Sequence, residues 1–391
     1  MPLLEVSLGV TATFLAVEAY RYHRHRRNLA RIPHRIHVNG TRGKSSVTRL
    51  IYAALRQLPG HRVAAKTTGT APRFLFPDGR EVPVFRAGRP NILEQLRIVQ
   101  RAVEAGADIL VLECMAITPE YLRVLEDRIV QSTVGVITNI REDHLDTMGP
   151  TLAHVARHLA LTTPRNGVLF TADQRFTRLL EAEARRRGSR LVVVRPEEWV
   201  QPGDLDGFSY VEHAENVALA LAVAQHFGLS REQALKGMWQ APPDPGALRR
   251  FRIALPDKTL WVYNAFAAND PESTRLIWQN VVARHPGVAT VALFVARKDR
   301  PQRTEAFARL LGRDLVADRY LLAGFVVHPV AAALRRHGVP ADRIRNLEGQ
   351  PADRVVQALL SLPARELLVV TMGNIVGLGQ EIVDRLQALH P

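Results

Sequence analysis

The stretch HVNGTRGKSSVTRL, His37–Leu50, decides how this chain folds. It holds the end of a Walker A phosphate loop, G-x-x-x-x-G-K-[ST], in the triplet Gly43–Ser45, although Val38 stands where the first glycine is usual. The segment before it, RIHVN, is typical of a short strand. Apolar residues then recur at helical spacing, at Val47, Leu50, Ile51, Ala54, Leu55 and Leu58. The stretch therefore predicts a strand, a phosphate-binding turn and a helix.

Such a turn binds phosphate through its backbone. The glycines let N–H groups close around the phosphate oxygens, and the N-terminus of the following helix adds positive potential. Lys44 then reaches the β- and γ-phosphates of a nucleotide, and Ser45 ligates magnesium. Because a lone G-K-S triplet often occurs by chance, the prediction of an ATP site depends on further residues.

Two groups of polar residues follow other predicted strands. Glu113 ends the strand DILVLE, and Asn139, Asp143, His144 and Asp146 lie at or just beyond the end of VGVITN. Ligands collect at the carboxyl ends of strands in open α/β sheets, where these side chains can hold one or two hard cations against phosphates. The alternatives are a strand-end cap for Glu113 and a surface position for His144, and Asp146 is better explained as structural.

The whole chain alternates short apolar runs with helical patterns from Arg35 onward, which indicates an α/β fold with largely parallel sheets. Strands are predicted at 35–39, 108–113, 134–139, 167–171 and 190–194, and again at 260–265, 288–296, 319–327 and 366–372. The proline-rich segment 238–251 is typical of a linker between domains. We expect an apolar helix with a basic segment at 1–29, an ATP-binding domain at 30–240 and a smaller α/β domain at 241–391.

Composition narrows the class of protein. With 391 residues and 47% hydrophobic content, the chain can bury a substantial core. Its single cysteine excludes an intramolecular disulfide framework and a multi-cysteine zinc site, which favours a reducing compartment. The net charge of +14 is compatible with nucleic acid, anionic lipid or an acidic substrate. Basic and aromatic residues do not interleave on one element, so nucleic-acid binding is not expected.

The N-terminus combines an apolar run with a basic one. The run LLEVSLGVTATFLAVEAY, residues 3–20, is 18 residues long, and six arginines without an acid follow between Arg21 and Arg35. A cleaved signal peptide would carry its positive charge before the apolar core. The positive-inside rule instead predicts a membrane anchor with the rest of the chain in the cytoplasm. The alternative is an amphipathic helix packed on a partner or on the body of the protein.

The loop NGTRGKSS resembles the G-T-x-G-K-[ST] loop of the Mur ligase superfamily, in which the first Walker glycine is not required. Glu113 and the N-x-x-x-D-H-x-D stretch from Asn139 onward match that superfamily in the same order. Within it, the chain resembles the PgsB/CapB family of poly-γ-glutamate synthase ligase subunits. That resemblance spans nearly the whole chain in the motifs KTTGTAP, ECMAITPEY, EDHLDTMGPTL, APPDPGALR, NAFAANDPEST and MGNIVGLG.

The resemblance implies roles for individual residues. Lys44, Glu113 and His144 are the implied catalytic residues, and magnesium would be held by Ser45, Glu113 and His144. Nucleotide binding is implied for Gly40, Thr41, Gly43, Lys44, Ser45, Ser46, Asn216, Arg249, Asn264, Asn269 and Asp270. Binding of the acidic substrate is implied for Lys66, Thr67, Thr68, Arg297, Arg300 and Arg303, although a surface charge cluster explains the three arginines equally well.

The chain also departs from the family pattern. Many Mur ligases carry a carbamylated lysine about one helix after the histidine, whereas HLDTMGPTLAHVARHLALTTP contains no lysine. The aspartate that usually contacts the ribose is replaced near Ala265. The phosphate loop begins about forty residues into the chain, which leaves no room for a domain that binds UDP-linked substrates. The resemblance therefore leaves the second metal and part of the nucleotide contact without their usual residues.

The resemblance implies an ATP-dependent amide ligase with a Mur-ligase-like ATPase domain and a Rossmann-like C-terminal domain. It would use ATP and Mg²⁺ to add glutamate through γ-linkages to a poly-γ-glutamate chain. It would act at the cell membrane as a homo-oligomer, with integral membrane subunits similar to PgsC/CapC and PgsA/CapA. The alternatives are a folylpolyglutamate-synthetase-type γ-glutamyl ligase and a membrane-tethered P-loop ATPase without ligase activity.

Overall fold

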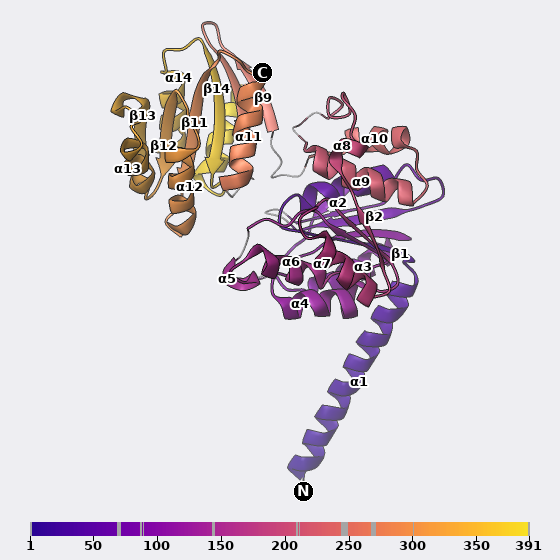
Figure 1. Ribbon diagram of the computed structural model, residues 1–391. Helices are drawn as coiled ribbons and strands as arrows, with labels where there is room; N and C mark the ends of the chain where they lie inside the picture. The colour runs from indigo at the N-terminus through magenta and orange to yellow at the C-terminus, as the bar shows by residue number, and fades with distance from the viewer. Residues whose placement is uncertain are drawn as a thin grey trace. The chain divides into compact units, whose positions relative to one another are not determined.

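The computed structural model describes residues 2–68, 72–86, 88, 90–142, 145–208, 210, 212–243, 249–266, 271–299 and 301–389. For residues 2–5, 145, 146 and 249 the description covers the backbone only. The chain divides into two compact units, residues 1–245 and 246–391. Each unit is built on a sheet of its own, and Figure 1 labels some of the strands of each.

The first unit contains an eight-stranded sheet in the order β4-β3-β2-β5-β1-β6-β7-β8. The neighbouring strands β2, β5, β1, β6, β7 and β8 pair in parallel. Strands β3 and β4 extend the β2 edge of the sheet in antiparallel fashion. The apolar side chains of β5 are fully buried, as expected for a parallel strand covered on both faces. The strands are β1 (His34–Asn39), β2 (Val63–Thr67), β3 (Arg73–Leu75), β4 (Glu81–Pro83), β5 (Ile109–Glu113), β6 (Val134–Ile137), β7 (Val168–Thr171) and β8 (Arg190–Val193).

Helices cover both faces of this sheet. Helix α2 (Lys44–Leu55) packs with α9 (Ala214–His226) and α10 (Arg231–Trp239) on one face. Apolar side chains from the other face of the sheet form two clusters with the remaining long helices. The other helices of the unit are α1 (Pro2–Ala30), α3 (Glu94–Glu104), α4 (Pro119–Val124), the π-helix η1 (Leu125–Val130), α5 (Leu145–Met148), α6 (Leu152–Ala160), α7 (Thr177–Arg186) and α8 (Pro196–Trp199).

The second unit has a six-stranded sheet in the order β13-β12-β11-β14-β10-β9. All its pairs are parallel except β9–β10. Its strands are β9 (Arg249–Ala254), β10 (Thr259–Asn264), β11 (Ala289–Ala296), β12 (Arg319–Gly324), β13 (Ile344–Glu348) and β14 (Glu366–Gly373). Its helices are α11 (Pro271–Ala283), α12 (Pro301–Arg313), α13 (His328–Arg336), the 3₁₀ helix η2 (Ala341–Arg343), α14 (Ala352–Leu360) and α15 (Leu378–Ala388).

The predicted α/β class is confirmed, with two mixed and mostly parallel sheets. Each strand predicted from the sequence is present, with ends that shift by up to three residues. Five strands, β2, β3, β4, β9 and β13, were not predicted. Strand β9 begins at Arg249, inside the segment predicted as a linker.

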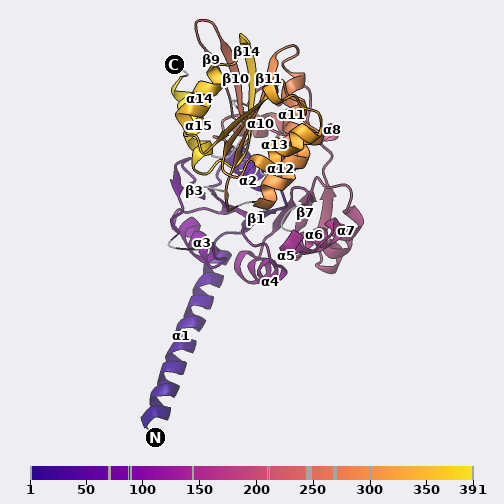
Figure 2. The same cartoon turned by 90° about the vertical axis from the view of Figure 1, so that its left-hand side faces the viewer.

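The N-terminal helix α1 is long and mostly exposed. Its large apolar side chains between Val6 and Tyr22 are 43–65% exposed, and Figures 1 and 2 show the helix extending away from the sheet. Its base is packed, because Leu29 and His25 are buried and His25 Nε2 lies 2.8 Å from the Ile129 carbonyl oxygen.

The sequence predicted a membrane anchor at this helix. Within the part of the chain that the structure describes, no helix is both long enough and apolar enough to cross a membrane. The apolar run and the arginines from Arg21 to Arg27 lie in one uninterrupted helix.

Candidate functional site

The phosphate loop leaves the carboxyl end of β1, at the centre of the first sheet, and leads into α2. Two glycines give it its shape. Gly40 has φ 131°, and a Cβ there would lie 2.0 Å from Thr138 Oγ1. Gly43 has φ 79°, and a Cβ there would lie 2.5 Å from Asn216 Oδ1. Glycine is required at both positions, since each combines a left-handed backbone with a close neighbour.

Hydrogen bonds from the end of β6 hold the loop in place. The Thr41 backbone N–H donates to the Asn139 carbonyl oxygen at 3.0 Å, and the Thr41 hydroxyl donates to Asn139 Oδ1 at 2.8 Å. The Arg42 backbone N–H also donates to Asn139 Oδ1, at 3.1 Å. The Thr138 hydroxyl donates to the Arg42 carbonyl oxygen at 2.6 Å. Asn139, considered from sequence as a cation ligand, therefore uses its side chain to brace the loop.

Lys44 and Ser45 begin α2 and point to different neighbours. Lys44 Nζ donates to the loop carbonyl oxygens of Gly40 at 2.8 Å and Thr41 at 3.2 Å, so the ammonium group folds over the loop. Ser45 Oγ donates to Glu113 Oε2 at 2.9 Å. The structure thus brings the loop serine and the strand-end glutamate into contact, although 68 residues separate them.

Glu113 is buried at the end of β5, beside the loop. The backbone N–H of Thr68 donates to the same carboxylate oxygen, Oε2, at 2.5 Å. Burial raises the pKa of this carboxyl, and Lys44 and the two hydrogen bonds oppose the rise. A hydroxyl and a carboxylate at the mouth of a phosphate loop are donors that suit Mg²⁺, so Ser45 and Glu113 fit the metal. Within the described residues, no group of three or more His, Cys, Asp and Glu side chains is arranged to hold a metal.

A buried ion pair lies next to Glu113. Lys66 is fully buried at the end of β2, and its Nζ lies 2.7 Å from Glu94 Oε1 and 3.1 Å from Thr68 Oγ1. Arg86 Nε binds the other carboxylate oxygen of Glu94 at 2.6 Å. Burial lowers the pKa of Lys66, and Glu94 opposes this. The side chains of Lys66 and Thr67 are thus buried, whereas Thr68 is half-buried.

Asn216 lies at the start of α9, against the phosphate loop. Its Nδ2 donates to Glu212 Oε1 at 2.8 Å, and the His213 backbone N–H donates to the same oxygen at 2.8 Å. Burial raises the pKa of Glu212 to about 7. Its second carboxylate oxygen, Oε2, is buried without a hydrogen-bond partner among the described residues. Glu212 thus fixes the amide of a predicted nucleotide contact.

The second unit places its predicted residues at the carboxyl ends of its strands. Asn264 ends β10, and its Oδ1 is 3.4 Å from the Thr371 hydroxyl of β14. Arg303 Nη1 donates to Asn374 Oδ1 at 2.8 Å, and Arg297 pairs with Asp299 at 2.7 Å. Arg303 is on α12 and Arg297 directly follows β11. The loops after β10, β11 and β14 therefore share one edge of this sheet.

Several predicted positions lie outside the described residues. These are Asp143 and His144 in the first unit and Asn269, Asp270 and Arg300 in the second, together with the side chains of Asp146 and Arg249.

Some residues of the site were not predicted from the sequence. Glu94 pairs with both Lys66 and Arg86, Glu212 accepts a hydrogen bond from Asn216, and Thr138 donates one to the loop. Thr138 had a usable signal, because it directly precedes Asn139 at the end of a predicted strand. Glu94 and Arg86 have no local signal, since Lys66 lies on a separate element. Glu212 lies only four residues before Asn216 and was missed although its partner is local.

Family comparisons cover most of the chain. Residues 38–203 match the Mur ligase middle domain, and residues 251–389 match the poly-gamma-glutamate synthase CapB C-terminal domain. The chain is 35% identical to the PGA synthase CapB of Bacillus subtilis over 96% of its length and 95% of that protein. It is also 35% identical to the capsule biosynthesis protein CapB of Bacillus anthracis, covering 97% of this chain and 82% of that protein.

Solved structures show the same fold at low sequence identity. E. coli FolC in complex with ADP superposes with a TM-score of 0.66 at 17% identity, over 96% of this chain and 98% of that chain. MurF from Acinetobacter baumannii superposes with a TM-score of 0.64 at 17% identity, over 94% of this chain and 79% of that chain. The predicted Mur-ligase-like fold is confirmed.

Proposed function

Since the chain belongs to the poly-γ-glutamate synthase CapB family of Mur ligases, which are ATP-dependent amide ligases, we propose that it adds glutamate through γ-linkages to a growing poly-γ-glutamate chain. One observation in the structure supports this most: Lys44 and Ser45 of the phosphate loop converge with buried Glu113. The loop supplies a place for the phosphates of ATP, and the Ser45–Glu113 pair supplies hard oxygen ligands.

The chemistry proceeds in two steps. A carboxylate at the end of the polymer attacks the γ-phosphorus of ATP, which gives an acyl phosphate and ADP. The amine of the incoming glutamate then attacks the acyl carbon, and phosphate leaves. The enzyme needs to position these groups and to neutralise charge, more than to form bonds with them.

The residues of the first unit meet those needs. The backbone N–H groups at the N-terminus of α2 would face the phosphates, since those of Thr41 and Arg42 already donate to Asn139. Lys44 would move from the loop carbonyl oxygens to the transferred phosphoryl group. Mg²⁺, when bound, offsets the charge of the phosphates, and Ser45 and Glu113 would hold it. Asn216, fixed by Glu212, would contact the base. Thr68 borders the site on the substrate side, with Lys66 behind it.

The remaining predicted residues keep their proposed roles. His144 would bind a second metal, and Ser46 and Thr41 would complete the phosphate loop. Arg249, Asn264, Asn269 and Asp270 would contact the nucleotide. Thr67, Arg297, Arg300 and Arg303 would bind the acidic substrate.

We also propose that α1 holds the enzyme at the cytoplasmic face of the cell membrane. Its exposed apolar side chains and the arginines that follow them suit a lipid surface or a membrane protein. Integral membrane subunits of the PgsC/CapC and PgsA/CapA kind would be its partners. A homo-oligomer remains a prediction of the resemblance.

The test uses membranes that contain this chain and its partner subunits. ADP and phosphate should be released in a glutamate-dependent way, together with an acid-hydrolysable, protease-resistant glutamate polymer. Lys44→Ala should lower polymer formation roughly a hundredfold to a thousandfold, because it removes one donor to the transferred phosphoryl group. Lys236→Ala, an exposed lysine on α10, is the matched control and should have no effect.

Three results would contradict the proposal. ATP turnover that is equal with and without glutamate would favour an ATPase without ligase activity. Polymer formation that is unchanged in Lys44→Ala would remove the phosphate loop from the reaction. Glutamate addition to a folate in place of the polymer would favour the folylpolyglutamate-synthetase-type alternative.

A further inference from the structure

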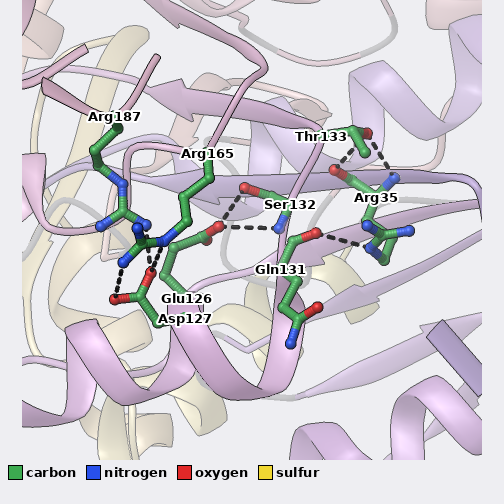
Figure 3. Close-up of a pocket in the computed structure, with 8 residues that line it drawn as sticks. All are labelled: Arg35, Glu126, Asp127, Gln131, Ser132, Thr133, Arg165 and Arg187. Atoms are coloured by element: carbon green, nitrogen blue, oxygen red, sulfur yellow. Dashed lines mark hydrogen bonds and ion pairs between the residues drawn. The ribbon is translucent and has the colours of Figure 1, made fainter. Parts of the chain in front are cut away.

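A polar pocket of about 360 Å³ lies at the amino end of the first sheet, the end opposite the phosphate loop. Its walls come from the start of β1, the first turn of η1, the turn between η1 and β6, and the turns before β7 and β8. Figure 3 shows the eight residues that line it, three of them arginines: Arg35, Glu126, Asp127, Gln131, Ser132, Thr133, Arg165 and Arg187. A cavity of this size accommodates a small ligand or the head of a larger one.

The charges around the pocket leave a positive excess. Both carboxylate oxygens of Glu126 already have partners. One lies 2.8 Å from His37 Nδ1, and the other accepts hydrogen bonds from the backbone N–H and the hydroxyl of Ser132. Burial lowers the pKa of His37, but Cys114 and Glu126 raise it to about 10 overall, so His37 is protonated at pH 7 beside the Glu126 carboxyl group. Arg165 and Arg187 both bind the carboxylate of Asp127, so two guanidinium groups share one negative charge.

The guanidinium groups of Arg165 and Arg187 have N–H donors that Asp127 does not use. Its carboxylate accepts from Arg165 Nε at 3.2 Å and also from Arg187. The Arg187 side chain is only 4% exposed, and its Nε has no hydrogen-bond partner among the described residues. Arg165 is 68% exposed at the rim. A planar guanidinium pair of this kind matches the oxygens of a phosphate group.

The pocket adjoins the root of α1. Arg35 Nη1 donates to the carbonyl oxygens of Ile32 at 2.6 Å and Leu29 at 3.3 Å, and its Nε donates to that of Gln131 at 2.8 Å. One residue therefore joins the end of α1 to the wall of the pocket. If α1 lies against lipid as proposed above, the pocket lies at the depth of the headgroups. The basic residues of α1, which include His23, Arg26 and Arg27, border a second, more open hollow on the same helix.

We propose that this pocket binds the phosphate of an anionic lipid headgroup, with Arg165 and Arg187 as its ligands. The proposal rests on the membrane attachment of α1. It gives the enzyme a preference for anionic over neutral lipid, in addition to the apolar contact of α1.

The first test is sedimentation of the full-length protein, without ATP, with vesicles of phosphatidylcholine alone or mixed with phosphatidylglycerol. The mixed vesicles should bind more tightly. Arg165→Glu should weaken that binding roughly ten- to thirty-fold, since it reverses one charge at the headgroup level. Arg178→Glu is the matched control. It makes the same charge change at an exposed arginine near the start of α7, whereas Arg187 of the pocket follows the end of that helix. This control should leave binding unchanged.

A second variant separates binding from a structural role. Asp127→Asn removes the one carboxylate that competes with phosphate, so binding to the mixed vesicles should tighten several-fold. A merely structural contact would be damaged by both substitutions, and both would then weaken binding and lower the thermal unfolding temperature. Loss of binding in Asp127→Asn, or equal binding by Arg165→Glu and Arg178→Glu, would overturn the proposal.

Competition distinguishes lipid from free phosphate. Monomeric short-chain phosphatidylglycerol should displace the protein from mixed vesicles, and inorganic phosphate at the same concentration should not. Equal displacement by inorganic phosphate would overturn the lipid assignment. Lys44→Ala should bind vesicles like the unchanged protein, so a failure of the ligase proposal and a failure of this one give different results.

Discussion

At the scale of single residues, Gly43 carries the most specific constraint in the first unit. Gly43 is the N-cap of α2 and has a left-handed φ of 79°. The Asn216 amide lies so close to its Cα that a Cβ does not fit. Asn216 is in turn oriented by Glu212, which is buried. One carboxylate oxygen of Glu212 has no hydrogen-bond partner among the described residues. The loop, the predicted base contact and a titratable carboxyl are therefore in one chain of contacts.

Gly43→Ala should weaken ATP binding and also destabilise the fold. The left-handed backbone alone costs an alanine roughly 1–2 kcal/mol, and displacement of Asn216 adds to that. Gly60→Ala is the control, since Gly60 has a similar φ of 76° but nothing within 4 Å of its Cβ position. Urea unfolding and ATP titration should show a stability loss for both variants and an affinity loss for Gly43→Ala alone. Equal ATP affinity in both would contradict the proposed role of the loop.

Glu212 should make stability depend on pH. Its folded pKa is about 7, above the ordinary value of 4.5, so between these pH values the folded state keeps a proton that the unfolded state loses. This contribution to the free energy of unfolding therefore falls as pH rises from 4.5 to 7, by up to about 3 kcal/mol, and is constant above that.

The measurement is urea unfolding across that pH window. Glu212→Gln should flatten this part of the profile, whereas Glu197→Gln, at an exposed position, should not. A profile that is the same in Glu212→Gln and in the unchanged protein would show that Glu212 does not titrate in this range.

At the scale of elements, the Lys66–Glu94 pair joins β2 to the first residue of α3. Lys66→Met should cost roughly 3–5 kcal/mol of unfolding free energy, because it leaves Glu94 buried with only Arg86. The double variant Lys66→Met/Glu94→Gln should recover part of that loss. Arg185→Met, which breaks the exposed Arg185–Glu181 pair, should cost less than about 1 kcal/mol. If urea unfolding gave a similar loss of unfolding free energy for Lys66→Met and Arg185→Met, the buried role of Lys66 would be contradicted.

The sequence predicted this architecture where the signal was local. The strand, turn and helix from Arg35 to Leu58 follow from apolar spacing and glycine, and Glu113 follows from its place at the end of an apolar strand. Strand β2 was missed because its five residues, Val63–Thr67, include a lysine, which alternation rules treat as exposed. That lysine is buried because Glu94 faces it, and no local pattern predicts a pair 28 residues apart. The same limit applies to Glu126 and His37.

At the scale of the whole molecule, the two units divide the predicted chemistry. The first carries the phosphate loop with Ser45 and Glu113, and the second carries the loops after β10, β11 and β14. The N-terminal helix belongs to the first unit, and only its last turns are packed.

Deletion of residues 2–22 should therefore separate attachment from folding. His25 and Leu29 keep their contacts in the shortened chain, so its thermal unfolding temperature should change little. Cell fractionation should show the shortened protein leaving the membrane fraction. Gln replacement of Phe14 and Leu15, two exposed apolar residues, should have the same effect with the helix intact. Retention of both variants on membranes would contradict the role of α1.

The hydrogen bonding of Arg35 to the end of α1 has a consequence for where the polymer is made. It fixes the root of α1 at the beginning of β1, and β1 is six residues long. A strand of that length spans about 20 Å, so the phosphate loop at its far end lies no further than this from the root of the helix. An enzyme attached through α1 would thus extend its product within a short, fixed reach of the bilayer. The growing end would then lie close to the integral membrane subunits proposed as partners.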